Sequence, residues 1–251
     1  MSQVLEKTAL ILNALKPTEH QIEWSATELS KDLNIPIQTL HRLLISLSKH
    51  GFVYRNDETK KFKLGLNLME LGLTIRDNLS VRNLALPEMR HLSELTNESV
   101  YLTIPEGPDG IFIECMDSPQ LLKIVEPVGM RRPLHKGGSK KVILAYLNKW
   151  QQDKVLNELS ARYQIKDMGI IRDDLLEIKK NGYAISHSET TEGTTSIASP
   201  IFSWEDEVLA SISIAGPDSR FKENRMSQLI QQTKACANRV SEELGWIKAN
   251  N

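Results

Sequence analysis

The chain has 251 residues, of which 40% are hydrophobic and 25% are charged, and its formal charge is −1 at pH 7. This length and composition are typical of a soluble protein with two domains. The two cysteines, Cys115 and Cys236, fit no CxxC or histidine-rich ligand pattern, which argues against a disulfide framework and a zinc cluster. No apolar run approaches the length of a membrane span, and Glu6 and Lys7 stand where a signal peptide would be apolar, so we expect a cytoplasmic protein with no membrane partner, no metal and no other cofactor.

The first predicted elements are two helices. Four apolar residues at helical spacing predict a first helix of about three turns that ends before Pro17: Leu5, Ala9, Leu12 and Leu15. Ser25 and Glu28 then have the spacing of a capping box, in which each side chain accepts a hydrogen bond from a backbone amide at the start of a helix. We expect this second helix over residues 26–33.

A third helix is predicted over residues 36–50. Pro36 suits its first turn, because the N–H that proline lacks would have no intrahelical partner there. Its apolar face, at spacing i, i+3, i+4 and i+7, consists of Leu40, Leu43, Leu44 and Leu47. The outward face consists of Gln38, Thr39, His41, Arg42, Ile45 and Ser46. Polar side chains on the first half of such a helix are typical of the recognition helix that a helix-turn-helix places in the major groove of DNA.

A basic hairpin follows this helix. Gly51 ends the helix, and residues 52–55 and 60–64 are predicted to form two short strands around the polar turn 56–59. Residues 36–63 hold six basic and two acidic side chains, a local charge of +4 in a chain of net charge −1. We interpret the hairpin as a wing whose lysines reach DNA phosphates. The residues expected to contact DNA are Ser25, Gln38, Thr39, His41, Arg42, Ser46, Arg55, Lys60 and Lys61.

Residues 1–65 are thus expected to form a winged helix-turn-helix. The alternative is a small solvated helical subdomain, since amphipathic helices with a few basic residues are common. Three short helices, a glycine stop and a basic hairpin, in this order, favour the DNA-binding interpretation.

A linker helix is expected over residues 66–80. It is apolar on more than one side, through Leu66, Leu68, Met69, Leu71, Leu73 and Ile75. Two interpretations fit it equally: a dimer interface that spaces two winged helices for a two-fold symmetric operator, or docking onto the next domain of the same chain.

Residues 81–251 mix helices and strands. Strands are expected over residues 100–104, 111–115, 122–125, 183–188, 195–202 and 208–216, with a turn at 107–110. A helix is predicted by Leu84, Met89, Leu92 and Leu95, two or three more between residues 139 and 180, and a closing helix over 226–244 that Gly245 ends. Strands grouped at both ends of a helical middle predict an α+β domain with an antiparallel sheet.

Several segments, taken in order, resemble those of IclR-family transcription regulators. Residues 39–44, with Leu47 and residues 51–53, are similar to the helix-turn-helix of that family. Landmarks of its effector domain are matched by residues 133–141, 144–145, 182–184, 189, 193, 197–200 and 216–217. The resemblance covers nearly the whole chain and implies a GAF-like effector domain, a homodimer or homotetramer, and control of catabolic or transport genes by a small molecule. The family includes repressors and activators; a repressor of a palindromic operator is the expected role.

The candidate effector site is the glycine-containing loop at residues 135–141. Free amides at a helix N-terminus have positive dipole character and suit a carboxylate, here at Gly137 and Gly138. The alternative from the residues alone is an ordinary loop in which Ser139 caps the helix. The resemblance implies that this loop faces the effector cavity together with the late strands, and it assigns to the effector Met130, Gly137, Gly138, Ser139, Ser186, Glu189, Ser196, Ile197, Ser211 and Ser213. We expect the effector to be a small organic acid, such as a sugar acid or an aromatic acid.

Four residues depart from the usual pattern of the family. Its members often have a small residue at the position of Lys136, glycine at Lys140, aspartate at Ser186 and cysteine at Ser196. An enzyme is not expected, because the groups capable of acid–base or nucleophilic work belong to no GxSxG, HExxH, Walker or GxGxxG motif: His135, Ser139, Glu189, His187 and Cys115. The remaining alternative, a small-molecule-binding module or enzyme with no role on DNA, leaves the basic wing unexplained.

Overall fold

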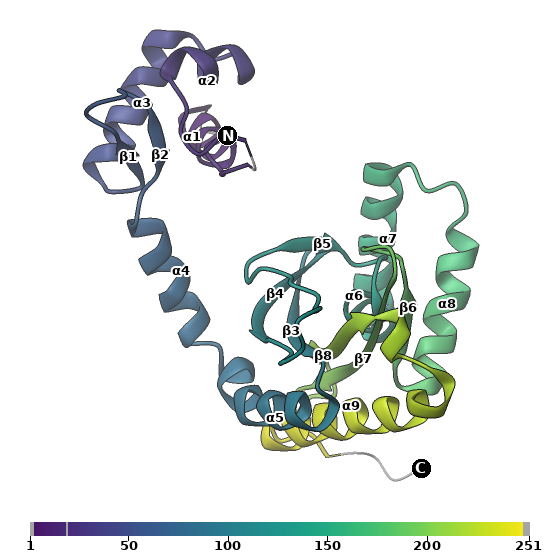
Figure 1. Ribbon diagram of the computed structural model, residues 1–251. Coiled ribbons are helices and arrows are strands. Elements are labelled where there is room, and N and C mark those ends of the chain that lie inside the picture. The colour runs from purple at the N-terminus through teal and green to yellow at the C-terminus, as the bar shows by residue number, and fades with distance from the viewer. Residues whose placement is uncertain (1–2, 19, 248–251) are drawn as a thin grey trace. The chain divides into compact units, whose positions relative to one another are not determined.

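The computed structural model describes residues 3–18 and 20–247. The chain divides into two compact units, residues 1–78 and residues 79–251 (Figure 1). Among the helices in the described ranges, none is both long enough and apolar enough to cross a membrane.

The first unit contains four helices and a two-stranded hairpin. Its elements are α1 (Gln3–Ala14), α2 (Ala26–Asp32), α3 (Ile37–Lys49), β1 (Val53–Arg55), β2 (Phe62–Leu64) and α4 (Asn67–Asp77). The three predicted helices and the predicted hairpin are confirmed, and Pro36 is the N-cap of α3 and precedes its first turn. The backbone of Trp24 pairs with that of Phe62 and extends the hairpin by one bridge.

The core of the first unit forms around α3. The four leucines predicted for its inner face are all buried: Leu40, Leu43, Leu44 and Leu47. They pack with Leu29 of α2, with Val53 and Phe62 of the hairpin, and with the end of α1. Helices this short are only marginally stable alone in water. Burial of this apolar stripe stabilises their folded state by about 25 cal/mol for each Å² of apolar surface removed from water.

The four residues whose spacing predicted α1 are not all in the core. Leu5 is 71% exposed and Ala9 is also exposed, whereas Ile11 and Leu15 are buried. The end of α1 reaches the core, where Leu12 and Ala14 pack beside Ile11 and Leu15. The first turns leave apolar side chains uncovered within this unit.

The capping box predicted at the start of α2 is confirmed. Ser25 Oγ accepts a hydrogen bond from the Glu28 amide at 3.2 Å, and Glu28 Oε2 accepts one from the Ser25 amide at 2.7 Å. The bond from the Ser25 amide favours the charged carboxylate and lowers the pKa of Glu28.

Replacing Ser25 with alanine is expected to lower the free energy of unfolding of the first unit by about 1 kcal/mol, because the Glu28 amide at the start of α2 loses its acceptor. Urea unfolding followed by circular dichroism measures this change. The matched variant Ser25→Asp keeps an acceptor at the N-cap and should stay within about 0.5 kcal/mol of the parent. Equal stability of the alanine and aspartate variants would contradict the role of the cap.

The second unit is built on a six-stranded antiparallel sheet. The strands are β3 (Ser99–Glu106), β4 (Asp109–Met116), β5 (Arg131–Pro133), β6 (Ala184–His187), β7 (Thr194–Phe202) and β8 (Val208–Pro217), in the order β5-β4-β3-β8-β7-β6. The helices are α5 (Ser80–Thr96), α6 (Gly138–Tyr146), α7 (Lys149–Tyr163), α8 (Met168–Asn181) and α9 (Glu223–Glu243), with a short 3-10 helix, η1 (Asp218–Arg220), before α9. The α+β class with an antiparallel sheet is confirmed.

The two faces of this sheet carry different helices. Figure 1 shows α5 and α9 side by side along one face, where they bury Val100, Leu102, Ile212 and Ile214 of the central strands. Helices α6, α7 and α8 form a second core on the other side, around Leu134, Ala184 and Ala198. Because side chains alternate along a strand, β7 supplies Ile197 to the first core and Ala198 to the second.

The helix predicted from Leu84, Met89, Leu92 and Leu95 is confirmed as α5; its buried stripe runs through Val81, Ala85, Met89 and Leu92, and Leu95 is 47% exposed. The strand predicted over residues 122–125 is wrong. Residues 122–125 lie in a loop that spans residues 117–130, and the edge strand β5 follows that loop. The loop backbone is held by side chains: Ile124 O accepts hydrogen bonds from Tyr101 Oη at 2.6 Å and from Ser99 Oγ at 3.1 Å.

Candidate functional site

The outward face of α3 is available to a partner. Gln38, His41, Arg42 and Ser46 are exposed, and Thr39 is half-buried. The N-cap of the helix, Pro36, makes no side-chain cap, so amides of the first turn face outward with the positive end of the helix dipole. Such a surface suits a phosphate at the helix start and base edges along the first two turns.

The wing is fixed to the segment before α2. Glu23 accepts hydrogen bonds from Asn56 Nδ2 at 3.2 Å and from Thr59 Oγ1 at 3.0 Å, and the bond from Asn56 lowers the pKa of Glu23. Lys60 is exposed at the tip of the turn with a φ of +58°, and Lys61 is half-buried beside it. The wing thus presents its lysines on a turn that is held in place.

Two of the predicted DNA contacts have structural partners. The Arg55 guanidinium lies 5.7 Å from the centre of the Phe62 ring, a cation–π contact that orients it. The Ser25 hydroxyl accepts the cap hydrogen bond, but a hydroxyl can donate at the same time. Both residues remain compatible with phosphate contacts.

A cavity lies in the second unit between the sheet and the start of α6. Its volume is about 30 Å³, enough for one or two water molecules in this conformation. It is lined by Tyr101, Phe112, Ile124, Glu126, Gly137, Ser139, Lys140, Ser186, Thr190, Thr191, Thr194, Ser196, Ser213 and Ala215. Side chains with hydroxyl groups, from β3, α6, β6, β7, β8 and the loop between β6 and β7, therefore line one small space.

Strand register builds the floor of the cavity. Ser186 of β6 pairs with Ser196 of β7, and Ser196 pairs with Ala215 of β8. Ser213, two residues before Ala215 on the same face, pairs with Tyr101 of β3. The cavity wall is thus a row across four neighbouring strands, closed by the loops at 117–130 and 188–193 and by α6.

Five of the ten predicted effector residues line this cavity: Gly137, Ser139, Ser186, Ser196 and Ser213. Ile197 does not, because it alternates with Ser196 and belongs to the core on the opposite face of the sheet. Ser211 donates a hydrogen bond to Ser139 O at 2.7 Å and holds α6 against the sheet. Gly138 packs against β7, where an added Cβ would lie 3.0 Å from Ser196 Oγ.

The other two predicted residues, Met130 and Glu189, also lie outside the lining. Met130 is half-buried in the loop before β5, where its carbonyl accepts a hydrogen bond from the Phe112 amide at 3.1 Å. Glu189 accepts hydrogen bonds from the Gly137 amide at 2.9 Å and from Lys141 Nζ at 2.7 Å. The Gly137 amide was expected to be free for the effector. It is not free, because it already donates to the carboxylate of Glu189.

The helix start also differs from the alternative interpretation of the loop. The N-cap of α6 is Gly137, with a φ of +83° that favours glycine, and no side chain caps the helix. Ser139 lies inside the first turn and faces the cavity. It is thus not a capping residue.

The cavity lining includes residues that the sequence interpretation missed. Tyr101 and Phe112 alternate along their strands with core residues, so they lie on the opposite face of the sheet, which lines the cavity. Strand periodicity is therefore the signal that could have found them. Thr190, Thr191 and Glu126 lie on loops, where no periodicity exists. Lys140 was noted as a departure from the family pattern but was not assigned to the cavity.

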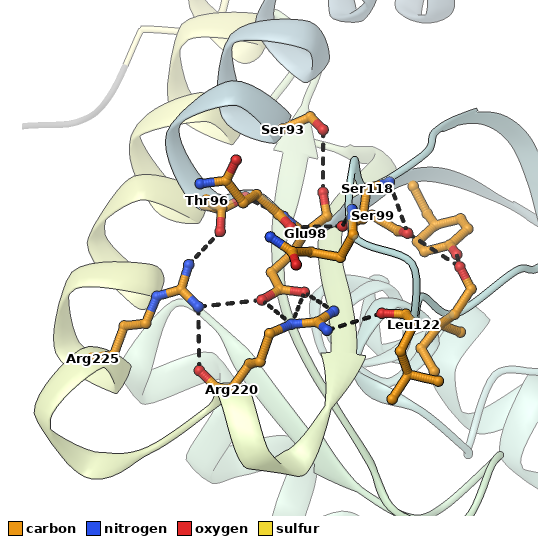
Figure 2. A network of polar contacts seen from close by, with 12 residues as sticks. Ser93, Thr96, Glu98, Ser99, Ser118, Leu122, Arg220 and Arg225 are labelled. Atoms are coloured by element: carbon orange, nitrogen blue, oxygen red, sulfur yellow. Dashed lines mark hydrogen bonds and ion pairs between the residues drawn. The ribbon is translucent and has the colours of Figure 1, made fainter.

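A buried ionic network fixes the loop over the cavity. Glu98 is 0% exposed, and Figure 2 shows its carboxylate between Arg220 and Arg225. Arg220 donates to both carboxylate oxygens through Nε, at 2.8 and 3.0 Å, and its Nη1 donates to Leu122 O at 2.9 Å. Ser99 of β3 holds the same loop from the sheet side, because its hydroxyl donates to Ile124 O and accepts from the Ser118 amide (Figure 2). Loop 117–130, which supplies Ile124 and Glu126 to the cavity, is thus anchored at its middle.

The groups that an enzyme would use are dispersed. Burial raises the pKa of Cys115 and of Cys236 to about 12, so both thiols stay protonated at neutral pH. Burial lowers the pKa of His135, whose ring contacts that of Tyr163, and His187 Nδ1 lies 2.9 Å from Thr195 Oγ1. Within the described ranges, no three histidine, cysteine, aspartate or glutamate side chains cluster as metal ligands.

Comparisons with known proteins match both units. Residues 4–57 match the family model described as the IclR helix-turn-helix domain, and residues 74–242 match that of the bacterial transcriptional regulator IclR C-terminal domain. The regulator KipR of Bacillus subtilis is 30% identical over 231 residues, 90% of this chain and 92% of KipR. The repressor AllR of Escherichia coli is 29% identical over 253 residues, 99% of this chain and 92% of AllR.

Solved structures share the fold. A crystal structure of an IclR homolog from Microbacterium hydrocarbonoxydans, complexed with 4-hydroxybenzoate, superposes with a TM-score of 0.79 over 97% of this chain and 99% of that one. Its sequence is 22% identical, so the likeness concerns the fold alone. The architecture of helix-turn-helix, connecting helix and effector domain is thus shared with solved proteins.

Proposed function

Because the chain belongs to the IclR family of transcription regulators, which is a family of DNA-binding proteins and not of enzymes, we propose that it is a repressor that binds a palindromic operator and is released or retained by a small organic acid. Residues 1–65 serve as the DNA-binding domain, residues 66–80 as the linker and residues 81–251 as the effector domain. The observation that carries the proposal is the exposed polar face of α3 beside a fixed basic wing. The similarity of the chain to the repressor AllR supports a role as a repressor.

Base reading and phosphate binding are divided between α3 and the wing. Gln38, Thr39, His41, Arg42 and Ser46 lie on the exposed side of α3, and arginine and glutamine pair bidentately with guanine and adenine. Ser25, Arg55, Lys60 and Lys61 contact phosphates, which give affinity and salt dependence but no sequence preference.

Two alanine variants test this division. Arg42→Ala is expected to weaken binding to the specific operator by about 1 to 3 kcal/mol and to relax the preference at one base pair. Lys61→Ala should weaken binding to all sequences alike and reduce the slope of log K against log salt by about one. Fluorescence anisotropy with DNA from upstream of the chain's own gene, over a range of salt, measures both. If Arg42→Ala behaved as Lys61→Ala, Arg42 would be a phosphate contact and not a base contact.

The linker helix supplies the dimer contact in this proposal. Helix α4 buries no side chain, and apolar residues along and just before it are exposed: Leu66, Met69, Leu71, Leu73 and Ile75. Val4, Leu5 and Leu10 of α1 are exposed as well. Monomeric proteins rarely leave so much apolar surface on one element, and a homodimer or homotetramer would cover it.

Sedimentation velocity tests the assembly. The full chain, of 28.4 kDa, is expected to sediment at twice that mass or more at micromolar concentration without ligand. The variant Ile75→Glu, which places a charge on the exposed apolar surface, should shift the equilibrium toward the monomer. A clean monomer for the parent chain would exclude the dimer.

The cavity of the second unit is the proposed effector site. Its position under two loops lets a ligand change their arrangement, and its hydroxyl-rich lining suits a small polar molecule. The relative complexed with 4-hydroxybenzoate supports an acid as the effector class. Glu189 already occupies the Gly137 amide, so the carboxylate of the effector needs another partner.

A further inference from the structure

Two neighbouring lysines at the start of α6 are buried and differ in their partners. Lys141 is 7% exposed, and its ammonium pairs with Glu189 Oε1 at 2.7 Å and with Asp174 Oδ2 at 2.9 Å. Lys140 is 4% exposed, and no ion pair or hydrogen bond joins its ammonium to another of the residues that the structure describes. A buried ammonium that makes no direct ion pair is costly, because the longer-range charges of Glu126 and Glu189 replace only part of its hydration.

The path of the Lys140 side chain directs its ammonium into this cavity. Its stem passes over Gly110, where an added Cβ would lie 2.9 Å from Lys140 Cγ. The ammonium lies 4.0 Å from the centre of the Phe112 ring, and both residues line the cavity. A cation–π contact orients the charge and offsets part of its desolvation, but it leaves the three N–H donors without acceptors.

The rest of the lining restricts what can accept those donors. Hydroxyl groups of Ser139, Ser186, Thr190, Ser196 and Ser213 face the same space, which is small. Acceptors and donors of this kind match hydroxyl groups on a ligand. Because the cavity volume is about 30 Å³, the loops must move for even a short ligand to enter, and a long chain would need a larger rearrangement. The ligand that satisfies both the cation and the hydroxyls is a short acid with at least one hydroxyl.

We propose that Lys140 binds the carboxylate of a short hydroxylated carboxylic acid in this cavity. This inference deepens the proposed function and rests on the cavity being the effector site. The carboxylate forms the ion pair that Lys140 lacks, while the ligand's hydroxyl exchanges hydrogen bonds with the serine and threonine hydroxyls. Glu189 acts as a positioning residue, since it holds the Gly137 amide and Lys141 and so fixes the start of α6.

The charges around Lys140 define how its binding depends on pH. Burial, with a contribution from Arg132, lowers the pKa of Lys140 to about 8, while Glu126 and Glu189 oppose the shift. Tyr101, on the adjacent strand, has its pKa raised by burial and stays neutral, and Lys141 is paired with Glu189. The ammonium is charged at pH 7 and loses its proton as the pH rises through 8. Affinity for a carboxylate is therefore expected to fall about tenfold between pH 7 and pH 9, as the protonated fraction does.

The experiment measures binding of glycolate and lactate to the full chain by calorimetry, with glycolamide and lactamide as neutral counterparts. The parent chain is expected to bind the acids at least tenfold more tightly than the amides. Lys140→Met, which keeps the volume and removes the charge, should lose at least tenfold in acid affinity. Lys136→Met removes the same charge from an exposed position in the same loop and should stay within about twofold of the parent.

Several outcomes would overturn the inference. These are acid affinity unchanged in Lys140→Met, amides bound as well as acids, no binding of either acid, or no loss of acid affinity from pH 7 to pH 9. The melting temperature of ligand-free Lys140→Met should equal or exceed that of the parent, because an unpaired buried charge is removed; a lower value would show that the charge has a partner. A chain that binds the acids through Lys140 but binds no specific DNA would support this inference. The same result would overturn the proposal that the chain is a repressor.

Discussion

Replacing Glu98 with glutamine is expected to destabilise the effector domain by about 3 kcal/mol. Removing one partner of a buried ion pair costs roughly 3 to 5 kcal/mol, because the remaining charge is left desolvated. Glu98 is fully buried, but the side chains of Arg220 and Arg225 are 22% and 32% exposed and can regain some hydration. This places the expected loss at the lower end of that range. Urea unfolding followed by fluorescence of the full chain measures the change.

The same substitution is expected to loosen the loop over the cavity. Arg220 joins Glu98 to Leu122 O, so an arginine released from Glu98 holds residues 117–130 less firmly. Hydrogen exchange at the amides of this loop should become faster in Glu98→Gln. The control is Glu94→Gln, at an exposed position of α5, which should change stability by less than about 0.5 kcal/mol. Equal effects of the two variants would contradict the structural role of Glu98.

Replacing Leu44 with alanine is expected to destabilise the first unit by about 2 to 5 kcal/mol. Leu44 is 0% exposed at the centre of the α3 core, and its truncation removes apolar contacts and leaves a cavity. A unit of 78 residues has little stability in excess, so this loss removes much of its folded population and, with it, specific DNA binding. Acid binding by the second unit should remain.

Ile22→Ala is the matched control for this prediction. Ile22 belongs to the same unit but is 67% exposed, so its truncation should change stability by less than about 0.5 kcal/mol and leave DNA binding intact. Circular dichroism during thermal unfolding follows both variants. A Leu44→Ala chain that retained parental stability would show that α3 is not held by this core.

Periodicity predicted the elements best where a stripe of apolar residues faces a single core. The four leucines of α3 and the alternation of β3, β7 and β8 belong to this class, since burial on one face fixes both the type of element and its orientation. Of the residues whose spacing predicted α1, Leu12 and Leu15 pack in the core, whereas Leu5 and Ala9 are exposed because the first turns of the helix lie outside that core. Residues 122–125 are apolar as a strand would be, yet side chains of distant residues hold them as a loop.

The cavity was predicted in part through the family resemblance. The resemblance assigned Ser186, Ser196 and Ser213 to the effector, and strand register brings them to one face of the sheet. The resemblance also assigned Glu189 to the effector, and local sequence does not reveal its bond to the Gly137 amide across more than fifty residues. The burial of Lys140 could not be predicted either, because it depends on the missing Cβ of Gly110 and on the ring of Phe112 in another strand.

The most direct test of the central claim is equilibrium binding of the full chain to DNA from upstream of its own gene, compared with unrelated DNA of equal length, as salt is varied. We predict specific binding at least a thousandfold tighter than non-specific binding, with affinity that falls steeply as salt rises and with a preference that Arg42→Ala reduces. Equal affinity for both DNAs at every salt concentration would contradict a sequence-specific regulator.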